Sequence, residues 1–424
     1  MPFHTKEFLK TVYLKSLVDV HPDALFSAYL HLYDRELYYR NTLIPLGSRG
    51  RLVLAGSGKA ALTMAKALTR YLPRPPDETL LIAPAGGNED MQGVYPGDHP
   101  VPAENSLASG QKMLELLDSL NEHDVLLYLL SGGSSSLFEV PAEGLTIEDI
   151  QAATRVFLSA GLPIREINFL RARLSQVKAG RLAARCKANC HVFVLSDVMG
   201  NDLSVIASGP FTTLDPHAMN LEGLIRDYAL DRRLPEHLLH LLRTNPPPQA
   251  AATVPHYLIG SNMEFLGAAE KHLEAEGIHT LSYPESLYGE ARDSAGMIAA
   301  MIRNYRGPKP ACLLFGGETT VTLSGDHGEG GRSQELALAA VSLLKDLPGT
   351  CLLAAGSDGI DGTGEAAGAV VDSGTYGLAL SLGLSPEPYL VRHDSAAFHR
   401  RCGTGIVTGP SGTNLGDLVM AMTG

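Results

Sequence analysis

Arg51-Leu-Val-Leu-Ala-Gly-Ser-Gly-Lys-Ala-Ala61 is the stretch that decides the predicted fold. It begins with an apolar run of strand length, continues through a glycine-rich turn, and leads into helix-forming residues from Lys59 to Tyr71. A strand, a tight turn and a helix in this order are typical of a parallel α/β sheet. In such sheets, small ligands bind at the loops that follow the carboxyl ends of the strands.

Six further loops rich in glycine, serine or acidic residues punctuate the chain. Five of them directly follow an apolar run, and the sixth, residues 328–332, precedes a helical pattern instead. The full set comprises residues 131–136, 196–202, 316–318, 328–332, 356–361 and 409–414. Glycines let backbone N–H groups approach an anion closely, and helix N-termini add a favourable dipole. The chain is therefore predicted to be an enzyme that acts on a phosphorylated compound.

The alternation of strands and helices predicts an α/β protein with two Rossmann-like domains and mostly parallel sheets. Strands are predicted at residues 51–55, 79–83, 124–130, 191–195, 256–260, 278–283, 312–315, 319–323, 351–355 and 406–408. Helices are predicted within residues 7–40 and at 59–71, 147–158, 169–184, 263–275, 291–305 and 333–344. Three consecutive prolines mark residues 244–253 as a linker. The predicted domains are therefore residues 1–245 and 254–424.

Composition restricts the class of protein. The chain has 424 residues, 45% of them hydrophobic and 19% charged, and a net charge of −12. The chain carries no long basic run, which disfavours a nucleic-acid partner, and its longest apolar runs are too short to span a membrane. Residues 1–10 lack the apolar core of a secretory signal. The five scattered cysteines indicate reduced thiols and a cytoplasmic setting, and Cys186 and Cys190 with His191 offer too few ligands for zinc.

The loop at Gly56 partly matches two nucleotide-binding motifs. A Walker A loop fails, because Val53 stands where glycine is needed and Ala60 follows Lys59. The spacing Gly56, Gly58, Ala61 fits a Rossmann fingerprint, but the second strand ends without an acid to hold a ribose. The alternative is a tight turn with an exposed lysine. Because a lysine at a helix start opposes the helix dipole, we expect Lys59 to touch an anion, with Gly56, Ser57 and Gly58 near a phosphate.

Ser131-Gly-Gly-Ser-Ser-Ser136 offers backbone N–H groups and hydroxyls at one strand end. Ser131, Gly132, Gly133, Ser134 and Ser135 are therefore predicted to cradle phosphate, although a flexible polar loop is the alternative reading.

Asp197 and Asp202 flank the next loop, where they could ligate magnesium or accept a proton from a substrate hydroxyl. For Asp202, an Asx-turn or a helix cap is the alternative.

The remaining polar loops lie in the second half of the chain. Glu318 is a candidate metal or substrate ligand, or a partner of a nearby cation. Arg332 begins a helix against its dipole, so we expect it to have an anionic partner. Asp358 and Asp361 are candidate magnesium or substrate contacts, and Asn414 ends a loop of nucleotide size. The isolated histidines His99 and His393 are read as structural.

In this order the loops resemble the type II glycerate kinases, or glycerate 2-kinases, which have a C-terminal MOFRL domain. The resemblance spans nearly the whole chain. Its stretches are Gly56-Ser-Gly-Lys-Ala-Ala61, His99-Pro-Val-Pro102, Leu130-Ser-Gly-Gly133, Glu166-Ile-Asn168 with Arg171 and Leu174-Ser175, Ser196-Asp-Val198, Ile206-Ala-Ser-Gly-Pro210, Gly316-Gly-Glu318, Gly330-Gly-Arg-Ser-Gln-Glu335, Asp358-Gly-Ile-Asp-Gly362, Ala366-Ala-Gly-Ala369 and Gly412-Thr-Asn414.

The resemblance implies phosphoryl transfer from MgATP to the 2-hydroxyl of D-glycerate, giving 2-phospho-D-glycerate. It also implies an interdomain active-site cleft faced by the residues matching Lys59 and Arg332. Asp197 is then the first candidate for the magnesium ligand or base, and Glu318 the second. The chain departs from the family pattern at Ser134, Arg173, Ser333, His393 and Ala396, which concerns the acceptor more than the reaction class.

Two other function classes are open to the sequence. A hydroxypyruvate reductase would use the Rossmann-like turn at Gly56 and would consume NADH. A sugar-phosphate sensor would bind a ligand without releasing ADP, but the chain has no basic segment through which to act on DNA. A monomer and a homodimer are equally compatible with the sequence.

Overall fold

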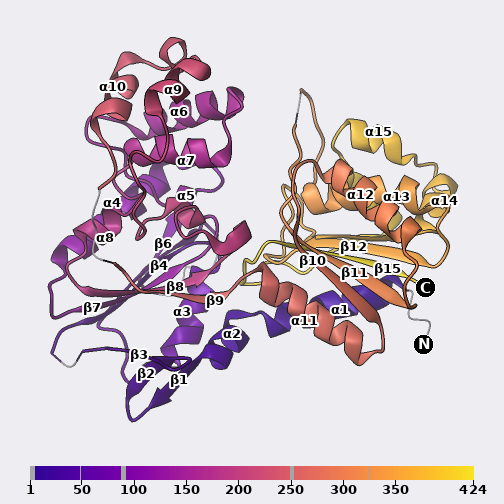
Figure 1. Ribbon diagram of the computed structural model, residues 1–424, viewed down its shortest axis with the longest axis horizontal. Helices are drawn as coiled ribbons and strands as arrows, with labels where there is room; N and C mark the ends of the chain where they lie inside the picture. Colours follow the sequence, from indigo (N-terminus) through magenta and orange to yellow (C-terminus); the bar gives the residue numbers. More distant parts are fainter. Residues whose placement is uncertain (1–4, 48, 87–91, 249–252, 324) are drawn as a thin grey trace. The chain divides into compact units, whose positions relative to one another are not determined.

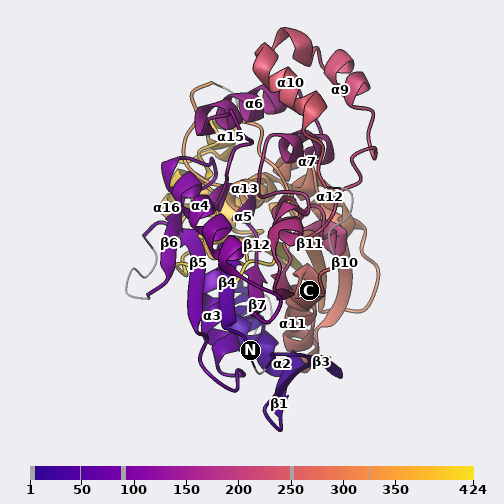
Figure 2. The ribbon, with the colours of Figure 1, turned by 90° about the vertical axis from the view of Figure 1, so that its left-hand side faces the viewer.

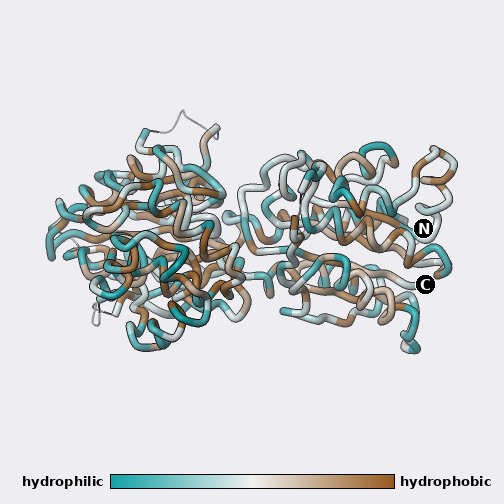
Figure 3. The backbone as a smooth tube through the Cα atoms, turned by 90° about the horizontal axis from the view of Figure 1, so that it is seen from above, coloured by the Kyte–Doolittle hydropathy of each residue, from teal (hydrophilic) through white to brown (hydrophobic). Residues whose placement is uncertain are grey.

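The computed structural model describes residues 5–47, 49–86, 92–248, 253–323 and 325–424. The chain divides into two compact units, which are described separately. The parallel-sheet unit comprises residues 26–195 and 201–259, and the mixed-sheet unit comprises residues 1–25, 196–200 and 260–424. Hydrophobic segments run through the middle of each unit, whereas many of the connecting loops are hydrophilic (Figure 3).

The parallel-sheet unit is built on six strands in the order β6-β5-β4-β7-β8-β9 (Figure 1). The printed pairs β4–β5, β4–β7, β5–β6 and β7–β8 are all parallel. Strand β9 follows β8 in the same direction, since Val192 N donates to Pro255 O and Ser196 N to Gly260 O. Numbered along the chain, this order is 3-2-1-4-5-6, the Rossmann order, which confirms the parallel α/β prediction. The strands are β4 (Leu52–Ser57), β5 (Glu78–Pro84), β6 (Val94–Gly97), β7 (Val125–Leu130), β8 (Asn189–Leu195) and β9 (His256–Gly260).

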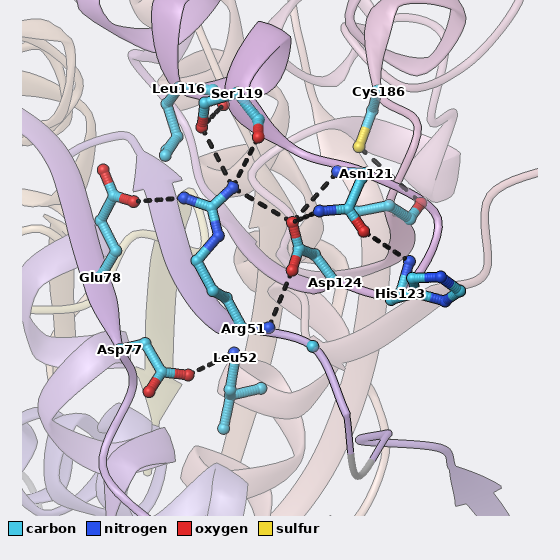
Figure 4. A network of polar contacts seen from close by, with 12 residues as sticks. Arg51, Leu52, Asp77, Glu78, Leu116, Ser119, Asn121, His123, Asp124 and Cys186 are labelled. Carbon is cyan, nitrogen blue, oxygen red and sulfur yellow. Dashed lines mark hydrogen bonds and ion pairs between the residues drawn. The ribbon is translucent and has the colours of Figure 1, made fainter.

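A polar network ties together the amino ends of β4, β5 and β7 (Figure 4). Asp124 is buried and accepts bonds from Arg51 N at 2.8 Å and Arg51 Nη2 at 3.1 Å. Asp77 accepts from Leu52 N at 2.7 Å, and Glu78 accepts from Arg51 Nη1 at 3.3 Å. Because these bonds join the starts of neighbouring strands, they fix the register that brings the opposite, carboxyl ends level.

Helices cover the parallel sheet and extend beyond it. Helix α3 lies on one side of the sheet, and α4 and α5 lie on the other (Figure 1). Helices α6, α7, α9 and α10 gather at one end of the unit around their own apolar core (Figure 2). These helices are α3 (Ala61–Thr69), α4 (Glu104–Ser119), α5 (Ser134–Leu137), α6 (Ile147–Ser159), α7 (Ile164–Arg173), α8 (Arg181–Arg185), α9 (Leu221–Asp227) and α10 (Glu236–Thr244), with short 3-10 turns at Met199–Asn201, Ile206–Ser208 and Leu230–Arg232.

Two predicted helices are shorter than expected. Residues 30–44 form a small antiparallel sheet after α1 (Lys6–Asp19) and α2 (Pro22–Tyr29), so the helical prediction was wrong beyond residue 29. Its strands are β1 (Leu30–Tyr33), β2 (Glu36–Tyr39) and β3 (Thr42–Ile44). The predicted helix 169–184 is interrupted between α7 and α8, where Ala179 and Gly180 have positive φ. Both errors arise at short turns that helical spacing does not reveal.

The mixed-sheet unit has six strands in the order β10-β11-β15-β12-β13-β14. Here the expectation of a mostly parallel sheet was wrong: β10 pairs with β11 in parallel, but the other printed pairs are antiparallel. The last strand of the chain, which was not predicted, inserts between β11 and β12. The predicted strand 319–323 makes only an isolated bridge at Thr320. The strands are β10 (His279–Leu287), β11 (Ala311–Gly317), β12 (Thr350–Gly356), β13 (Gly368–Asp372), β14 (Gly405–Ile406) and β15 (Asp417–Thr423).

Helices cover both faces of the mixed sheet, with α12 and α13 on one side and α1 and α11 on the other (Figure 1). Helix α13 is buried along most of its length and forms the centre of the unit's apolar core. The helices of this unit, apart from α1, are α11 (Asn262–Ala275), α12 (Ala291–Asn304), α13 (Arg332–Leu344), α14 (Thr375–Ser381), α15 (Pro386–Val391) and α16 (Ser395–Cys402). None of the helices within the described ranges is long and apolar enough to cross a membrane.

The compact units differ from the predicted domains 1–245 and 254–424. The first 25 residues belong to the mixed-sheet unit, because α1 packs against β12 and β13. Strand β9 lies beyond the proline-rich linker, yet it completes the parallel sheet. The linker prediction itself falls partly on residues 249–252, outside the described residues. The proline run thus marks a connection inside the parallel-sheet unit.

Candidate active site

The turn that joins β4 to α3 uses its backbone amides within the protein. Gly58 N donates to Ile82 O at 3.1 Å, Lys59 N to Gly132 O at 3.0 Å, and Ala60 N to Ser131 Oγ at 3.0 Å. Gly58 has a φ of +128°, and a Cβ there would lie 2.1 Å from Ser131 Oγ. The glycine is thus required for the close packing of two strand ends. The prediction that residues 56–58 cradle a phosphate finds no unpaired amide in this part of the described chain.

Loop 131–136, which follows β7, has the opposite arrangement. Its buried hydroxyls are used internally, because Ser131 Oγ accepts from Ala60 N and Ser134 Oγ bonds to Ser57 Oγ. Among the described residues, no acceptor takes the backbone N–H of Gly132, Gly133, Ser134 or Ser135. Buried or half-buried amides need a partner. The backbone of this loop therefore offers N–H donors of the kind that bind a phosphate. Its hydroxyls hold the loop in place.

Lys59 and His99 lie against this loop. A Cβ added to Gly133, whose φ is +81°, would lie 3.2 Å from Lys59 Cγ and 3.2 Å from His99 Cδ2. Lys59 comes from the end of β4 and His99 from the segment after β6, so three strand ends of one sheet contribute to this edge. His99 was read as structural from its isolation in sequence. The available signal was the stretch His99-Pro-Val-Pro102, which is one of those that carry the family resemblance.

In the mixed-sheet unit, Arg332 begins α13 and has two carboxylate partners. Its Nε and Nη2 donate to Asp417 Oδ2 at 2.6 Å and Oδ1 at 3.0 Å, and its Nη1 forms an ion pair with Glu318. Burial acts to lower the pKa of Arg332, but the charges of Asp417 and Glu318 outweigh it and raise that pKa. The expected anionic partner of Arg332 therefore exists, and it is part of the protein.

The strand register explains how these groups meet. Asp417 pairs with Gly317 on one side and with Gly356 on the other. Glu318 directly follows β11, so its carboxylate and that of Asp417 reach the same guanidinium. Asp417 was missed by sequence reasoning because the last strand was not predicted, although its position before an apolar run was the available signal.

Asp361 caps α13. Its Oδ1 accepts from Ser333 N at 3.1 Å, and its Oδ2 accepts from Gln334 N at 2.8 Å. Burial, together with the nearby charge of Asp417, raises the pKa of Asp361 to about 7, against the opposing effect of these amide bonds. Asp358 Oδ1 accepts from Ile360 N at 3.2 Å, in the turn leading to Asp361. This capping geometry gives Asp361 a structural role at the start of α13, and its predicted contact with magnesium or substrate stays a prediction.

The two aspartates predicted as a pair belong to different units. Asp197 is in the mixed-sheet unit, where its Oδ2 accepts from Asn414 Nδ2 at 2.8 Å. Asp202 is in the parallel-sheet unit and accepts from Ser204 N at 3.0 Å and Ser204 Oγ at 2.6 Å, which is the Asx-turn given as its alternative. Within the described residues, no group of three or more histidine, cysteine or acidic side chains is arranged to hold a metal ion.

His393 lies in a partly buried polar cluster beside α13. Its Nδ1 is 3.0 Å from Arg292 Nη2 and 3.1 Å from Glu335 Oε1. Arg292 Nε also donates to Glu335 at 2.7 Å. These contacts hold α13 against the segment that contains His393, which agrees with the structural role expected for His393.

Comparison with known proteins assigns the family. Residues 8–243 match the model of a domain of unknown function, DUF4147, and residues 311–417 match the MOFRL family. A D-glycerate 2-kinase of Thermotoga maritima is 38% identical over 89% of this chain and 92% of its own length. A protein of Agrobacterium vitis, provisionally named a hydroxypyruvate reductase, is 33% identical over 94% of this chain and 93% of its own.

The crystal structure of glycerate kinase from Thermotoga maritima superimposes with a TM-score of 0.82 and 35% identity, covering 99% of each chain. Similarity over this length includes both units and every polar loop described above. The chain belongs to the glycerate 2-kinase family, with DUF4147 and MOFRL domains.

Proposed function

We propose that this protein is an ATP-dependent D-glycerate 2-kinase, which transfers a phosphoryl group to the 2-hydroxyl of D-glycerate and releases 2-phospho-D-glycerate and ADP. The carrying observation is the 38% identity to a D-glycerate 2-kinase over 89% of the chain. The hydroxypyruvate reductase alternative has weaker support, because it depends on a provisional name at 33% identity.

The phosphates of ATP are assigned to loop 131–136. Amides from Gly132 to Ser135 have no acceptor among the described residues, and Lys59 lies against the same loop. Backbone donors fixed around an anion stabilise developing negative charge without reorganising during the reaction. Lys59 would neutralise charge on the transferred phosphoryl group, which is the main demand of phosphoryl transfer. Gly56, Ser57 and Gly58 would position Lys59.

The mixed-sheet unit supplies the acidic chemistry. Asp197 and Glu318 are the carboxylates assigned to magnesium, or to the proton of the acceptor hydroxyl, with Asn414 holding Asp197. Magnesium commonly takes one or two protein carboxylates and completes its shell with water and phosphate oxygens, so these donors fit it. When bound, the ion would neutralise phosphate charge. Asp358 lies close enough to Asp417 and Tyr13 to shape this acidic edge.

Arg332 is assigned to an anionic group of the substrates. Asp417 holds two of its nitrogens in a bidentate pair, which fixes the plane of the guanidinium. Its Nη1 is shared with Glu318, whose side chain is 42% exposed. Movement of Glu318 toward a cation would release Nη1 for the carboxylate of glycerate or for a phosphoryl oxygen.

The setting of the reaction is proposed to be the cytoplasm. All five cysteines are free, which suits a reducing compartment. The assembly state, monomer or homodimer, stays a prediction.

The test is an ADP-release assay with D-glycerate, L-glycerate, hydroxypyruvate and related hydroxy acids. We expect MgATP-dependent turnover that is highest with D-glycerate, and phosphorus NMR should identify the 2-phosphate. Formation of the 3-phosphate would reject the stated regiochemistry. NADH consumption with hydroxypyruvate in the absence of ADP release would reject the kinase and favour the reductase.

A further inference from the structure

Two cations, the buried Lys178 and the partly buried Arg171, converge on one carbonyl group of loop 131–136. Lys178 Nζ donates to Ser135 O at 2.8 Å, and Arg171 Nη2 donates to the same oxygen at 3.2 Å. Lys178 lies just before the Ala179–Gly180 turn, and Arg171 lies in the last turn of α7. Both residues therefore belong to segments that are not strands of the sheet, and their side chains extend to the loop.

A buried carboxylate accompanies these cations. Glu139 Oε2 is 2.9 Å from Lys178 Nζ, with side chains 1% and 2% exposed, and Ser175 Oγ donates to Glu139 Oε1 at 2.5 Å. Burial lowers the pKa of Lys178 to about 8, with Glu139 opposing and Arg171 reinforcing that shift. Taking such charges out of water is costly, so the arrangement needs a benefit beyond packing.

The benefit lies in how the carbonyl sets the direction of the amides. In a helical turn such as α5, the carbonyl groups point toward one end and the N–H groups toward the other. Donors that hold Ser135 O therefore fix the position and orientation of this turn, and the N–H groups at its start are oriented with it through the turn's backbone geometry. These include the amides of Gly133, Ser134 and Ser135, which have no acceptor among the described residues.

We infer that Arg171 and Lys178 are positioning residues, which clamp the Ser135 carbonyl and thereby preorganise the amides of loop 131–136 for the phosphates of ATP. The functional half of this inference rests on the proposed kinase function. Glu139 fixes Lys178 in the clamp and touches no substrate. Preorganised donors act without reorientation during binding, so loss of the clamp weakens the ATP site more than the glycerate site.

The first experiment measures the loop itself. Lys178→Met combined with Glu139→Gln removes one positive and one negative buried charge, so the net charge around Arg171 is unchanged and the protein is expected to fold. Hydrogen–deuterium exchange of peptides covering residues 131–137 should then rise on the order of tenfold in the unliganded protein. Unchanged exchange in the folded variant would overturn the clamp. This readout needs no turnover, so it decides the inference even where the kinase assignment fails.

The matched control is Arg181→Lys. Arg181 begins α8 in the same segment, but its guanidinium donates to the carbonyls of Ala172 and Asn245 rather than to the loop. We expect exchange in residues 131–137 to stay at the wild-type level in this variant. A rise equal to that of the clamp variant would show general loosening and would overturn the specific role.

The second experiment separates the two substrates. In the charge-neutral double variant, the KM for ATP should rise about tenfold, equivalent to ~1.4 kcal/mol, with the KM for D-glycerate changed less than twofold. The single variant Lys178→Arg, which keeps a cation at this position, should keep the KM for ATP close to the wild-type value. An equal rise in both KM values, or no rise in either, would reject the positioning role. Absent turnover in the wild-type protein would reject the proposed function instead.

Discussion

The two units place opposite chemistry at the polar edges of their sheets. In the parallel-sheet unit, Lys59 lies against loop 131–136, and Lys178 and Arg171 donate to the Ser135 carbonyl of the same loop. In the mixed-sheet unit, Asp417 and Glu318 surround Arg332, and Asp361 lies next to it. The first edge is therefore rich in cations and backbone N–H donors, and the second is rich in carboxylates.

The contrast shows that a cation at a helix start has more than one physical meaning. Lys59 and Arg332 both oppose a helix dipole, so the sequence assigns the same expectation to both. Arg332 has the expected anionic partner in Asp417, which lies 85 residues further along the chain and is brought close by the fold. Lys59 lies against loop 131–136, where the described residues supply no acceptor for the backbone N–H groups of Gly132 to Ser135.

The largest effect is expected at the donor-rich edge. Lys59→Ala should lower kcat on the order of 10²–10³-fold, as removal of a positioned transition-state donor does, without changing the melting temperature substantially. The measurement is steady-state ADP release with saturating ATP and D-glycerate. Lys66→Ala, which changes an exposed lysine on α3, the helix that follows Lys59, is the matched control and should keep wild-type turnover. Near-normal kcat in the Lys59 variant would remove this residue from the catalytic set.

The acidic edge should lose both stability and activity when its cation is removed. Arg332→Ala leaves Asp417, whose side chain is 5% exposed, without its partner, and should cost about 2 kcal/mol of unfolding free energy. This loss of unfolding free energy is smaller than for a fully buried pair, because the Arg332 side chain is 34% exposed. Turnover should fall strongly as well.

Adding Asp417→Asn to this variant separates the two effects. The double variant removes the unpaired buried charge, so denaturant unfolding should show most of the lost stability recovered. Turnover should stay low, because the guanidinium is still absent. Recovery of activity together with stability would make Arg332 a structural residue only.

Sequence reasoning reached the parallel sheet and most of its polar loops because they are local. Five of its six strands are apolar runs followed by their own turns, as at residues 51–61, whereas β6, with the sequence Val-Tyr-Pro-Gly, was not predicted. It failed where distant segments meet: β15 enters between β11 and β12, and Asp417 enters with it. It also could not distinguish the amides of turn 56–60 from those of loop 131–136, since both are glycine- and serine-rich. The packing of Ser131 against Ala60 shows that the amides of turn 56–60 already have acceptors within the protein.

A smaller, pH-dependent effect is expected at the cap of α13. The pKa of Asp361 is raised from 3.8 to about 7, so between these values the native state binds more protons than the unfolded state. Its stabilising contribution is therefore complete below about pH 4 and is lost as pH rises through 7. Asp361→Asn removes this titration, so the melting temperature should vary less with pH between 4 and 7 than in the wild type. Parallel profiles for the two proteins would contradict the raised pKa.

The smallest effect tests whether the hydroxyls of loop 131–136 hold the loop or bind the ligand. Ser131 Oγ accepts from Ala60 N at 3.0 Å and is fully buried, so Ser131→Ala should cost about 1 kcal/mol of unfolding free energy through one unsatisfied amide. The KM for ATP should change less than twofold. Ser135→Ala, which keeps the clamped carbonyl, should change neither quantity. A large rise in the KM for ATP with unchanged stability in the Ser131 variant would show that the Ser131 hydroxyl binds ATP. The proposed division between hydroxyls that hold the loop and amides that bind the ligand would then be wrong.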